Sequence, residues 1–172
     1  MRADKTSNDT QRTPQTEYIK QGTHKAILYS IADLGTQLQH SKQYGDKQVR
    51  QCKITFELVN VRKVFSEDKG EQRAVLSQNY TLSMYNSHLK RLVETLQGKS
   101  LSEEDAKNFD LMDILGASCM LQIIHNGEYA NIKTIMGVDE DYGMAENELV
   151  LFDLDKYDHE QYQALPNFVK EK

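Results

Sequence analysis

The stretch VRQCKITFELV at residues 49–59 carries the clearest secondary-structure signal in the chain. Its apolar residues recur at every second position, and polar residues fill the positions between them. The apolar positions are Cys52, Ile54, Phe56 and Leu58, and the polar ones are Gln51, Lys53, Thr55 and Glu57. Because successive side chains of a strand point to opposite faces of a sheet, this alternation predicts a β-strand with one buried face and one solvent-facing one.

Runs with the same period flank this stretch on both sides. Upstream, residues 23–34 predict a strand that ends at Gly35 and leads into a polar loop. Its in-phase residues are Ile27, Tyr29 and Ile31. Downstream, a charged turn precedes a third strand at 73–84, so that the second and third strands are expected to form a long hairpin.

The period then changes from two to that of a helix. In residues 86–98, leucine and valine recur at i, i+3, i+4 and i+7, with Ser87 or Asn86 as N-cap and Gly98 after the last turn. Ser102 and Asp105 resemble a capping box that opens a second short helix running into residues 109–116.

Two strands and an extension complete the chain. Residues 117–125 and 128–136 return to the period of two, and Asn126-Gly127 between them predicts a hairpin with a type I′ turn. An acidic linker, the apolar run LVLF and a last helix beginning near Asp158 follow.

The predicted order is strand, strand, strand, helix, strand, strand. This order is that of the OB-fold and predicts a mainly β protein: a five-stranded Greek-key barrel with a helical insert between strands three and four, and a C-terminal acidic segment plus helix. A five-stranded meander with a helical insert, or an unrelated α+β domain, has the same order. The expected division is a flexible arm at 1–17, the OB-fold domain at 18–138 and the extension at 139–172.

Composition narrows the functional classes. The 172 residues contain 38% hydrophobic and 27% charged residues, and no apolar run approaches the 18 residues of a membrane span. The N-terminus has no apolar stretch of a secretory signal, so an intracellular location is expected. The two cysteines, Cys52 and Cys119, are expected to be buried free thiols, and neither they nor the five histidines have metal-ligand spacing.

No sequence motif indicates an enzyme. The chain lacks GxxxxGK[ST], GxGxxG, GxSxG and HExxH. We therefore predict no catalytic residues, no metal and no cofactor.

Charge is unevenly distributed along the chain. The net charge is −5, yet residues 1–100 carry 16 Lys and Arg against 10 Asp and Glu, whereas residues 139–160 carry nine acids and one lysine. A basic body followed by an acidic segment fits a nucleic-acid binder with a self-competing or partner-recruiting tail, but charge alone favours a solvated C-terminal region.

Several stretches in a fixed order resemble one family. They are GTHKAILYSIADLGTQ, VRQCKITFELVN, YTLSM before the first helix, FDL and ILG after it, HNGEYANI across the last hairpin, and ALPNFVKEK near the end. Together, over residues 18–170, they resemble bacteriophage-encoded OB-fold single-stranded DNA-binding or replication-accessory proteins. The resemblance implies action in phage DNA replication, recombination or repair, in the cytoplasm of an infected bacterial host.

The candidate binding residues come from the residue pattern and not from the resemblance. Single-stranded nucleic acid needs cations for its phosphates and aromatic rings for its bases. Such residues occur in the loop between the first two strands, on strands two and three, and on strand five: Lys42, Tyr44, Lys47, Arg50, Lys53, Arg73, Tyr80, Tyr129 and Lys133. Tyr80, in phase with aliphatic neighbours, also fits a core position.

We therefore expect a sequence-tolerant single-stranded DNA-binding protein. The acidic segment at 139–160 is expected to compete with DNA for the basic face and, once freed, to contact replication or recombination proteins. The competing expectation is that LVLF and the LPNFVKEK helix pack on the barrel and stabilise it, or make a dimer contact. The alternative function is an OB-type protein-interaction module that binds a host or phage protein.

Overall fold

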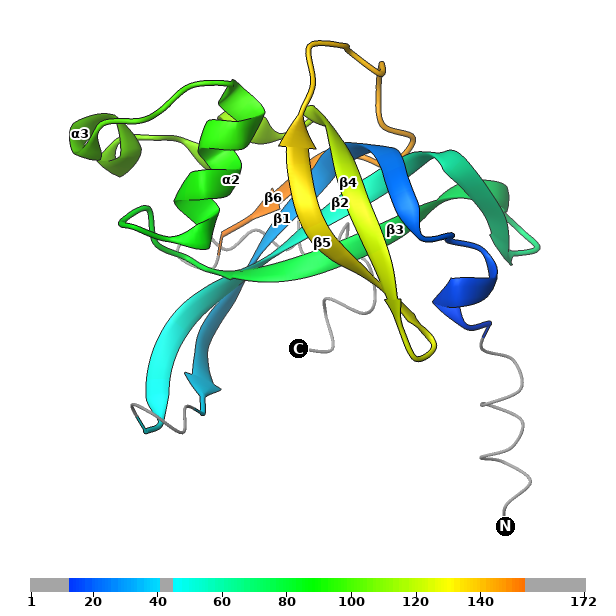
Figure 1. Cartoon of the computed structure of the whole chain (residues 1–172), viewed down its shortest axis with the longest axis horizontal. Coiled ribbons are helices and arrows are strands. Elements are labelled where there is room, and N and C mark those ends of the chain that lie inside the picture. The colour runs from blue at the N-terminus through cyan, green and yellow to red at the C-terminus, as the bar shows by residue number, and fades with distance from the viewer. Residues whose placement is uncertain (1–12, 41–44, 154–172) are drawn as a thin grey trace.

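The computed structural model describes residues 13–40 and 45–153 and is mainly β (Figure 1). The strands are β1 (Gly22–Gln39), β2 (Lys47–Ser66), β3 (Gly70–Thr81), β4 (Ser118–Asn126), β5 (Tyr129–Gly137) and β6 (Val150–Phe152). The helices are α2 (His88–Gln97) and α3 (Glu103–Lys107), with short 3-10 turns η1 (Gln15–Glu17) and η2 (Leu111–Ile114). No helix of the described ranges is long and apolar enough to cross a membrane.

One six-stranded sheet contains all the strands. Five of them follow the order β3-β2-β1-β4-β5, with antiparallel neighbours throughout, and β6 pairs in parallel with β1. A simple meander is excluded, because β1 lies between β2 and β4. The sheet is not closed, since β3 and β5 are its end strands and do not pair with each other.

β1 and β2 extend well beyond their predicted ends. Gly35 does not end β1 as expected: it has φ +74° at a register shift between Asp33 and Gly35, and its N–H donates to the Asp33 carboxylate at 2.8 Å. A glycine in this conformation allows a bulge, so the strand bends and continues. Residues 36–39 of the predicted polar loop therefore belong to β1 and, paired with the start of β2, form a β-ribbon that projects from the sheet (Figure 1).

A second bulge changes which β1 side chains face the core. The register shifts between Leu28 and Ser30, so Ala26, Leu28 and Ile31 belong to the main core. Ile27 and Tyr29 are buried too, but outside that cluster. The predicted single phase of Ile27, Tyr29 and Ile31 is therefore wrong, because the bulge reverses the alternation.

The main core lies between the inner face of the sheet and α2. The predicted apolar face of β2 is confirmed, since Cys52, Ile54, Phe56 and Leu58 are all buried in it. They meet buried residues from β1, β3 and β4 and the apolar stripe of α2, which comprises Leu89, Leu92 and Val93.

The helix boundaries follow their capping residues. Ser87 accepts from the Lys90 N–H and Gly98 has φ +71°, so both predicted ends of α2 are confirmed. Ser102 caps α3, but α3 ends at Lys107 and does not continue as predicted. Asp110 starts a separate 3-10 turn by accepting from the Met112 N–H.

The β4–β5 hairpin is confirmed, and its turn is displaced by one residue. Asn126 pairs with Tyr129, so the two turn residues are Gly127 and Glu128. Gly127 has φ +63° and Glu128 has no positive φ. The predicted type I′ turn is therefore wrong, because that turn needs positive φ at both positions.

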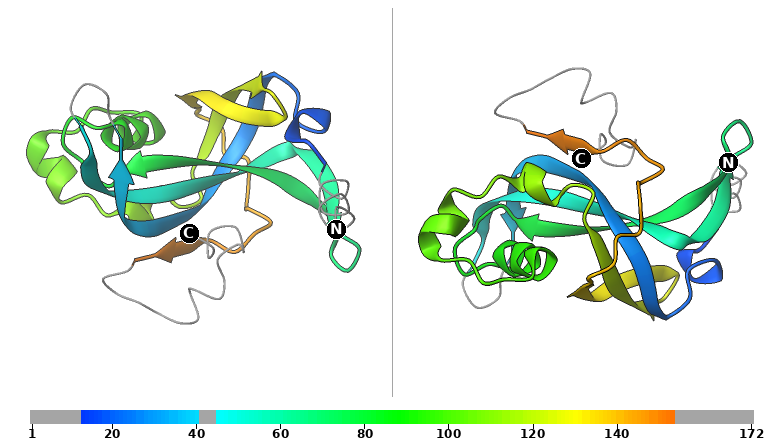
Figure 2. Two further views of the ribbon diagram at one scale, coloured as in Figure 1. Left: turned by 90° about the horizontal axis from the view of Figure 1, so that it is seen from below. Right: turned by 90° about the horizontal axis from the view of Figure 1, so that it is seen from above.

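The acidic linker is a strap, residues 138–153, that crosses the outer face of β1, β2 and β3. Its end, including β6, lies on the side of these strands opposite β5 (Figure 2). Lys53, Thr55 and Glu57, expected to face solvent, are consequently buried. The two faces of β2 are thus both covered, although only one is apolar.

Glu57 joins the strap to the sheet. Its carboxylate is fully buried and accepts from the backbone N–H of Glu146 at 2.7 Å, from the backbone and side-chain N–H groups of Asn147, and from Arg73 Nη1 at 2.9 Å. Burial, together with the Glu57 charge, raises the pKa of neighbouring Tyr29. A buried carboxylate is tolerated where its oxygens are satisfied in this way.

Replacing Glu57 by alanine should therefore destabilise the fold strongly. The substitution leaves the half-buried Arg73 guanidinium and three strap N–H groups without their acceptor, and breaking such a pair costs about 3–5 kcal/mol. Urea unfolding measures the loss. Glu71→Ala is the matched control, because Glu71 pairs with Arg62 at the exposed surface, where an ion pair contributes below about 1 kcal/mol. Equal effects of the two substitutions would contradict this role of Glu57.

The two cysteines are buried free thiols, as predicted. Burial raises the pKa of both Cys52 and Cys119 to about 12. Since the thiolate is the reactive form, neither should be alkylated by iodoacetamide at pH 8 in the folded protein, whereas both should be alkylated in urea. Mass spectrometry reads the adducts, and the exposed Asn131→Cys variant is the positive control. Modification of native Cys52 or Cys119 at the rate of the control would contradict this prediction.

Candidate functional site

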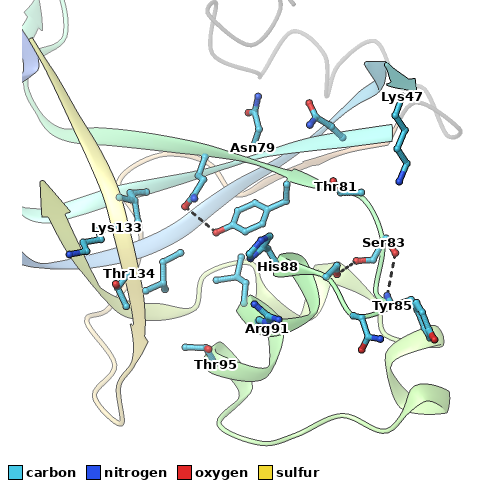
Figure 3. Close-up of a pocket in the computed structure, with 18 residues that line it drawn as sticks. Lys47, Asn79, Thr81, Ser83, Tyr85, His88, Arg91, Thr95, Lys133 and Thr134 are labelled. Atoms are coloured by element: carbon cyan, nitrogen blue, oxygen red, sulfur yellow. Dashed lines mark hydrogen bonds between the residues drawn. The ribbon is translucent and has the colours of Figure 1, made fainter. Parts of the chain in front are cut away.

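An open groove of about 810 Å³ lies where the sheet fails to close (Figure 3). Its walls are the end strands β3 and β5, helix α2 and the start of β2. The lining residues are Lys47, Gln51, Gln78, Asn79, Tyr80, Thr81, Ser83, Tyr85, Asn86, Ser87, His88, Arg91, Leu92, Thr95, Ile132, Lys133, Thr134 and Ile135. We call this the β3–β5 groove.

The position of α2 against β5 sets one side of the groove. A Cβ atom at Gly137, the last residue of β5, would lie 2.6 Å from the backbone oxygen of Thr95 in α2. The helix and the strand therefore approach each other too closely for any other residue. Their contact fixes the distance of α2 from the groove-lining part of β5.

The charged groups of the groove are all basic. Lys47, Arg91 and Lys133 are exposed, His88 accompanies them, and no carboxylate among the described residues lines the groove. Within the described ranges none of these three cations forms an ion pair. In Figure 3, Lys47 lies on one side of the groove and Lys133 on the other, with His88 and Arg91 of α2 between them. Such an arrangement favours anionic ligands.

An exposed aromatic ring stands at the edge of the groove. Tyr85 is 71% exposed, in the connection between β3 and α2. The connection is braced: the Tyr85 N–H donates to Ser83 Oγ at 3.2 Å, and the Ser87 hydroxyl donates to the Ser83 carbonyl. Asn86 has φ +44°, an uncommon conformation outside glycine. The backbone around Tyr85 is thus fixed while its ring stays accessible.

Three of the sequence-predicted site residues meet in this groove: Lys47, Tyr80 and Lys133. Tyr80 is a core residue, 6% exposed, and its hydroxyl donates to Gln78 Oε1 at 3.2 Å. Burial raises its pKa, so it stays protonated. Lys133 sits at an irregularity between β4 and β5, where Ile132 and Thr134 pair with consecutive β4 residues. It is the extra residue of that bulge.

Three predicted basic residues lie on the outer face or its edge. Arg73 pairs with Glu57 and also contacts the strap through the Met144 carbonyl at 3.4 Å. Arg50 pairs with the buried Asp33 and has Asp153 at 3.8 Å. Lys53 is buried. The strap and the sheet thus surround these cations with protein groups.

The remaining predicted residues lie apart from the groove. Tyr129 is 50% exposed beside the β4–β5 turn and does not line the groove. Lys42 and Tyr44 lie outside the described residues. The ribbon that leads to them is described, and Lys47 and Gln51 at its base belong to the groove.

The groove contains functional candidates that sequence reasoning missed, chiefly Tyr85 and Arg91. Tyr85 follows the last in-phase residue of the predicted third strand and precedes the helix cap, so it had no predicted packing position. Like Tyr44 in the polar loop between the first two predicted strands, it is an aromatic residue outside the predicted apolar faces. Arg91 lies on the polar face of α2, and only the position of β5 shows what that face meets.

The polar and aromatic groups of the groove define the ligand chemistry that it can accommodate. Within residues 13–40 and 45–153, no group of three or more His, Cys, Asp or Glu side chains could hold a metal ion. The groove supplies separated cations, amide side chains from Gln51, Gln78 and Asn79, and one exposed ring. These groups match phosphates, base edges and base faces respectively.

Substituting Gly137 by alanine should alter both stability and groove shape. The new Cβ forces β5 and α2 apart, because the obstacle is backbone rather than a flexible side chain. We expect a loss of about 1–3 kcal/mol, the usual cost of overpacking, measured by thermal unfolding. Asn131→Ala, at an exposed position of the same strand, is the control, because it adds no atom and meets no close contact. A Gly137→Ala protein as stable as wild type would contradict the close contact.

Comparisons with known proteins identify no relative: no protein-family model, no curated protein and no solved structure matches the chain at a significant level. The assignment of function therefore depends on the groove and on the sequence pattern.

Proposed function

We propose that the chain binds single-stranded nucleic acid in the β3–β5 groove. The observation that carries this proposal is the contrast among the basic residues. Arg50, Arg62 and Arg73 each pair with a carboxylate, whereas the lysine and arginine side chains of the groove have no such partner in the described chain. Cations left unpaired on opposite sides of one groove suit a phosphate backbone.

Tyr85 is the reason that we expect the protein to prefer single strands over duplex. An exposed ring stacks on an unpaired base, whereas the bases of a duplex are already stacked on each other. The neighbouring Asn79 and Gln51 amides provide hydrogen bonds that do not select one base strongly. Binding is therefore expected to tolerate many sequences.

The strand order supports an OB-type interpretation of the sheet. In an OB-fold, β1 pairs with both β2 and β4, and a helix lies between β3 and β4; the same neighbours occur in this chain. We infer an open variant in which the β3–β5 groove stands at the unclosed seam. The resemblance to phage proteins adds DNA replication, recombination or repair as the proposed process.

A protein-interaction module is the second candidate, and one observation favours it. Among the described strands, β3 and β5 each have one edge that pairs with no other strand, beside the groove. An extended peptide can add to such an edge through main-chain hydrogen bonds. Peptide addition does not need the groove cations, so charge-dependent binding separates the two candidates.

Fluorescence anisotropy of a labelled thymidine oligonucleotide of about 30 nucleotides tests the proposal. Wild-type protein should bind it with strong salt dependence, and duplex of the same length should compete poorly. Tyr85→Ala should weaken binding by about 1–3 kcal/mol, the contribution of one stacked base. Arg91→Gln should reduce the slope of log affinity against log salt by about 0.7.

Tyr129→Ala is the matched control, since it removes an exposed tyrosine outside the groove. It should leave affinity unchanged. Absence of binding by folded protein at low salt would overturn the proposal, and a pull-down with peptide libraries would then test strand-edge addition. Equal losses in Tyr85→Ala and Tyr129→Ala would place the binding site elsewhere.

A further inference from the structure

We propose a second contact surface for the same nucleic-acid strand, in a separate basic groove at the other end of β2. This inference rests on the proposed function and extends it to a bipartite site. The groove measures about 580 Å³ and is lined by Tyr18, Lys20, Thr23, His24, Lys25, Asn60, Val61, Arg62 and Met120. We call it the β1–β2 groove.

The β1–β2 groove opens because the two strands part. β1 and β2 are paired from Ala26 and Leu58 toward the ribbon. Before Ala26, β1 pairs with β4, and beyond Leu58 the partner of β2 is β3, with Arg62 opposite Arg73. Each strand thus keeps its other neighbour while the space between them widens.

Charge in this groove follows the pattern of the first one. No carboxylate lines it, and Lys20 and Lys25 form no ion pair within the described part of the chain. Arg62 differs, because it is paired with both Glu71 and Glu146. Its hydrogen bond to Glu146 lowers the pKa of that carboxyl group, which stays ionised. The two lysines are therefore the cations that a phosphate would meet.

Tyr18 is the aromatic residue that lines this groove, and Lys63 and Phe65, which lie beside the groove and do not line it, contact the Tyr18 ring. Lys63 Nζ lies 4.2 Å from the ring centroid of Tyr18, and Phe65 packs edge-on against Tyr18 with 5.9 Å between centroids. Phe65 is 49% exposed. A lysine beside exposed aromatic surface is the combination that nucleic-acid grooves use for phosphates and bases.

The two grooves stand at a separation that a long oligonucleotide can span. Gln51 lines the first and Val61 the second, ten residues apart on β2, which corresponds to roughly 33 Å at strand spacing. A strand of about five nucleotides, at roughly 3.4 Å per nucleotide, occupies one groove only. A strand of about 30 nucleotides reaches both.

The test compares oligonucleotides of about five and about 30 nucleotides on the Lys20→Gln, Lys25→Gln double variant. We expect about tenfold weaker binding of the long strand at low salt, a reduction of the salt slope by about 1.4, and unchanged binding of the short strand. Lys99→Gln with Lys107→Gln is the control, because it removes two exposed lysines that line neither groove.

Each other result overturns the inference. Unchanged binding of the long strand would reject the second groove, and equal weakening for both lengths would reject a bipartite site, while wild-type binding still supports the proposed function. Polyglutamate of the same charge as the long oligonucleotide serves as a competitor. If it abolishes only the part of the affinity that Lys20 and Lys25 contribute, the β1–β2 groove binds acidic peptides and not nucleic acid. Failure of the wild-type protein to bind either length would overturn the proposed function itself.

Discussion

The shared pairing of β1 is the constraint on which the rest of the structure depends. Along one edge β1 pairs with β2 over most of its length, whereas along the other it pairs first with β4, over residues 22–27, and then with β6, over residues 30–32. The bulge between Leu28 and Ser30 lies where the partner changes. β4 and β5 therefore leave the sheet plane together, so that β5 turns toward β3 without pairing to it, and the β3–β5 groove is the space that remains.

The same constraint explains why the strap is an integral part of the fold. Once β4 has diverged, the edge of β1 at residues 30–32 has unpaired backbone groups, and β6 supplies partners for them. The chain must cross the outer face to reach that edge, and Glu57 receives the backbone N–H groups of the crossing segment. A carboxylate on the outward phase of a strand thus becomes a buried connector.

The sequence predicted the strands, the capped helix α2 and the buried thiols because these features follow from local periodicity and local turn chemistry. It failed where a bulge reversed the alternation, as at Tyr29, or where a glycine allowed a strand to continue, as at Gly35. Arg50 and Arg73 carried the right charge for a phosphate site. Their partners Asp33 and Glu57 are 17 and 16 residues away in sequence, and only the strand register places them within contact.

The sequence predicted which types of residue the candidate groove would contain. It did not predict which residues would line the groove together. Lys47, Tyr80 and Lys133 were singled out from three different strands, but nothing in their spacing shows that β3 and β5 face each other across α2. Tyr85 and Arg91 were not singled out. One is an aromatic residue in a loop and the other lies on the polar face of a helix, and their role depends on which strands lie opposite them. Long-range strand order therefore decides which residues form the site.

The protein has a net charge of −5, yet the proposed ligand is a polyanion. The two are compatible because the acidic and basic side chains lie on different parts of the surface. Residues 138–153 contain six acids and no Lys or Arg, and they lie over the outer face, where Glu146 engages Arg62 and the Arg73 backbone. The strap thereby neutralises outer cations and leaves acidic groups on that side. A nucleic-acid strand approaching the strap itself meets like charge, whereas the β3–β5 groove, which no carboxylate of the described residues lines, attracts it. The acidic segment thus directs the proposed ligand to the groove by its fixed position, without having to leave the sheet.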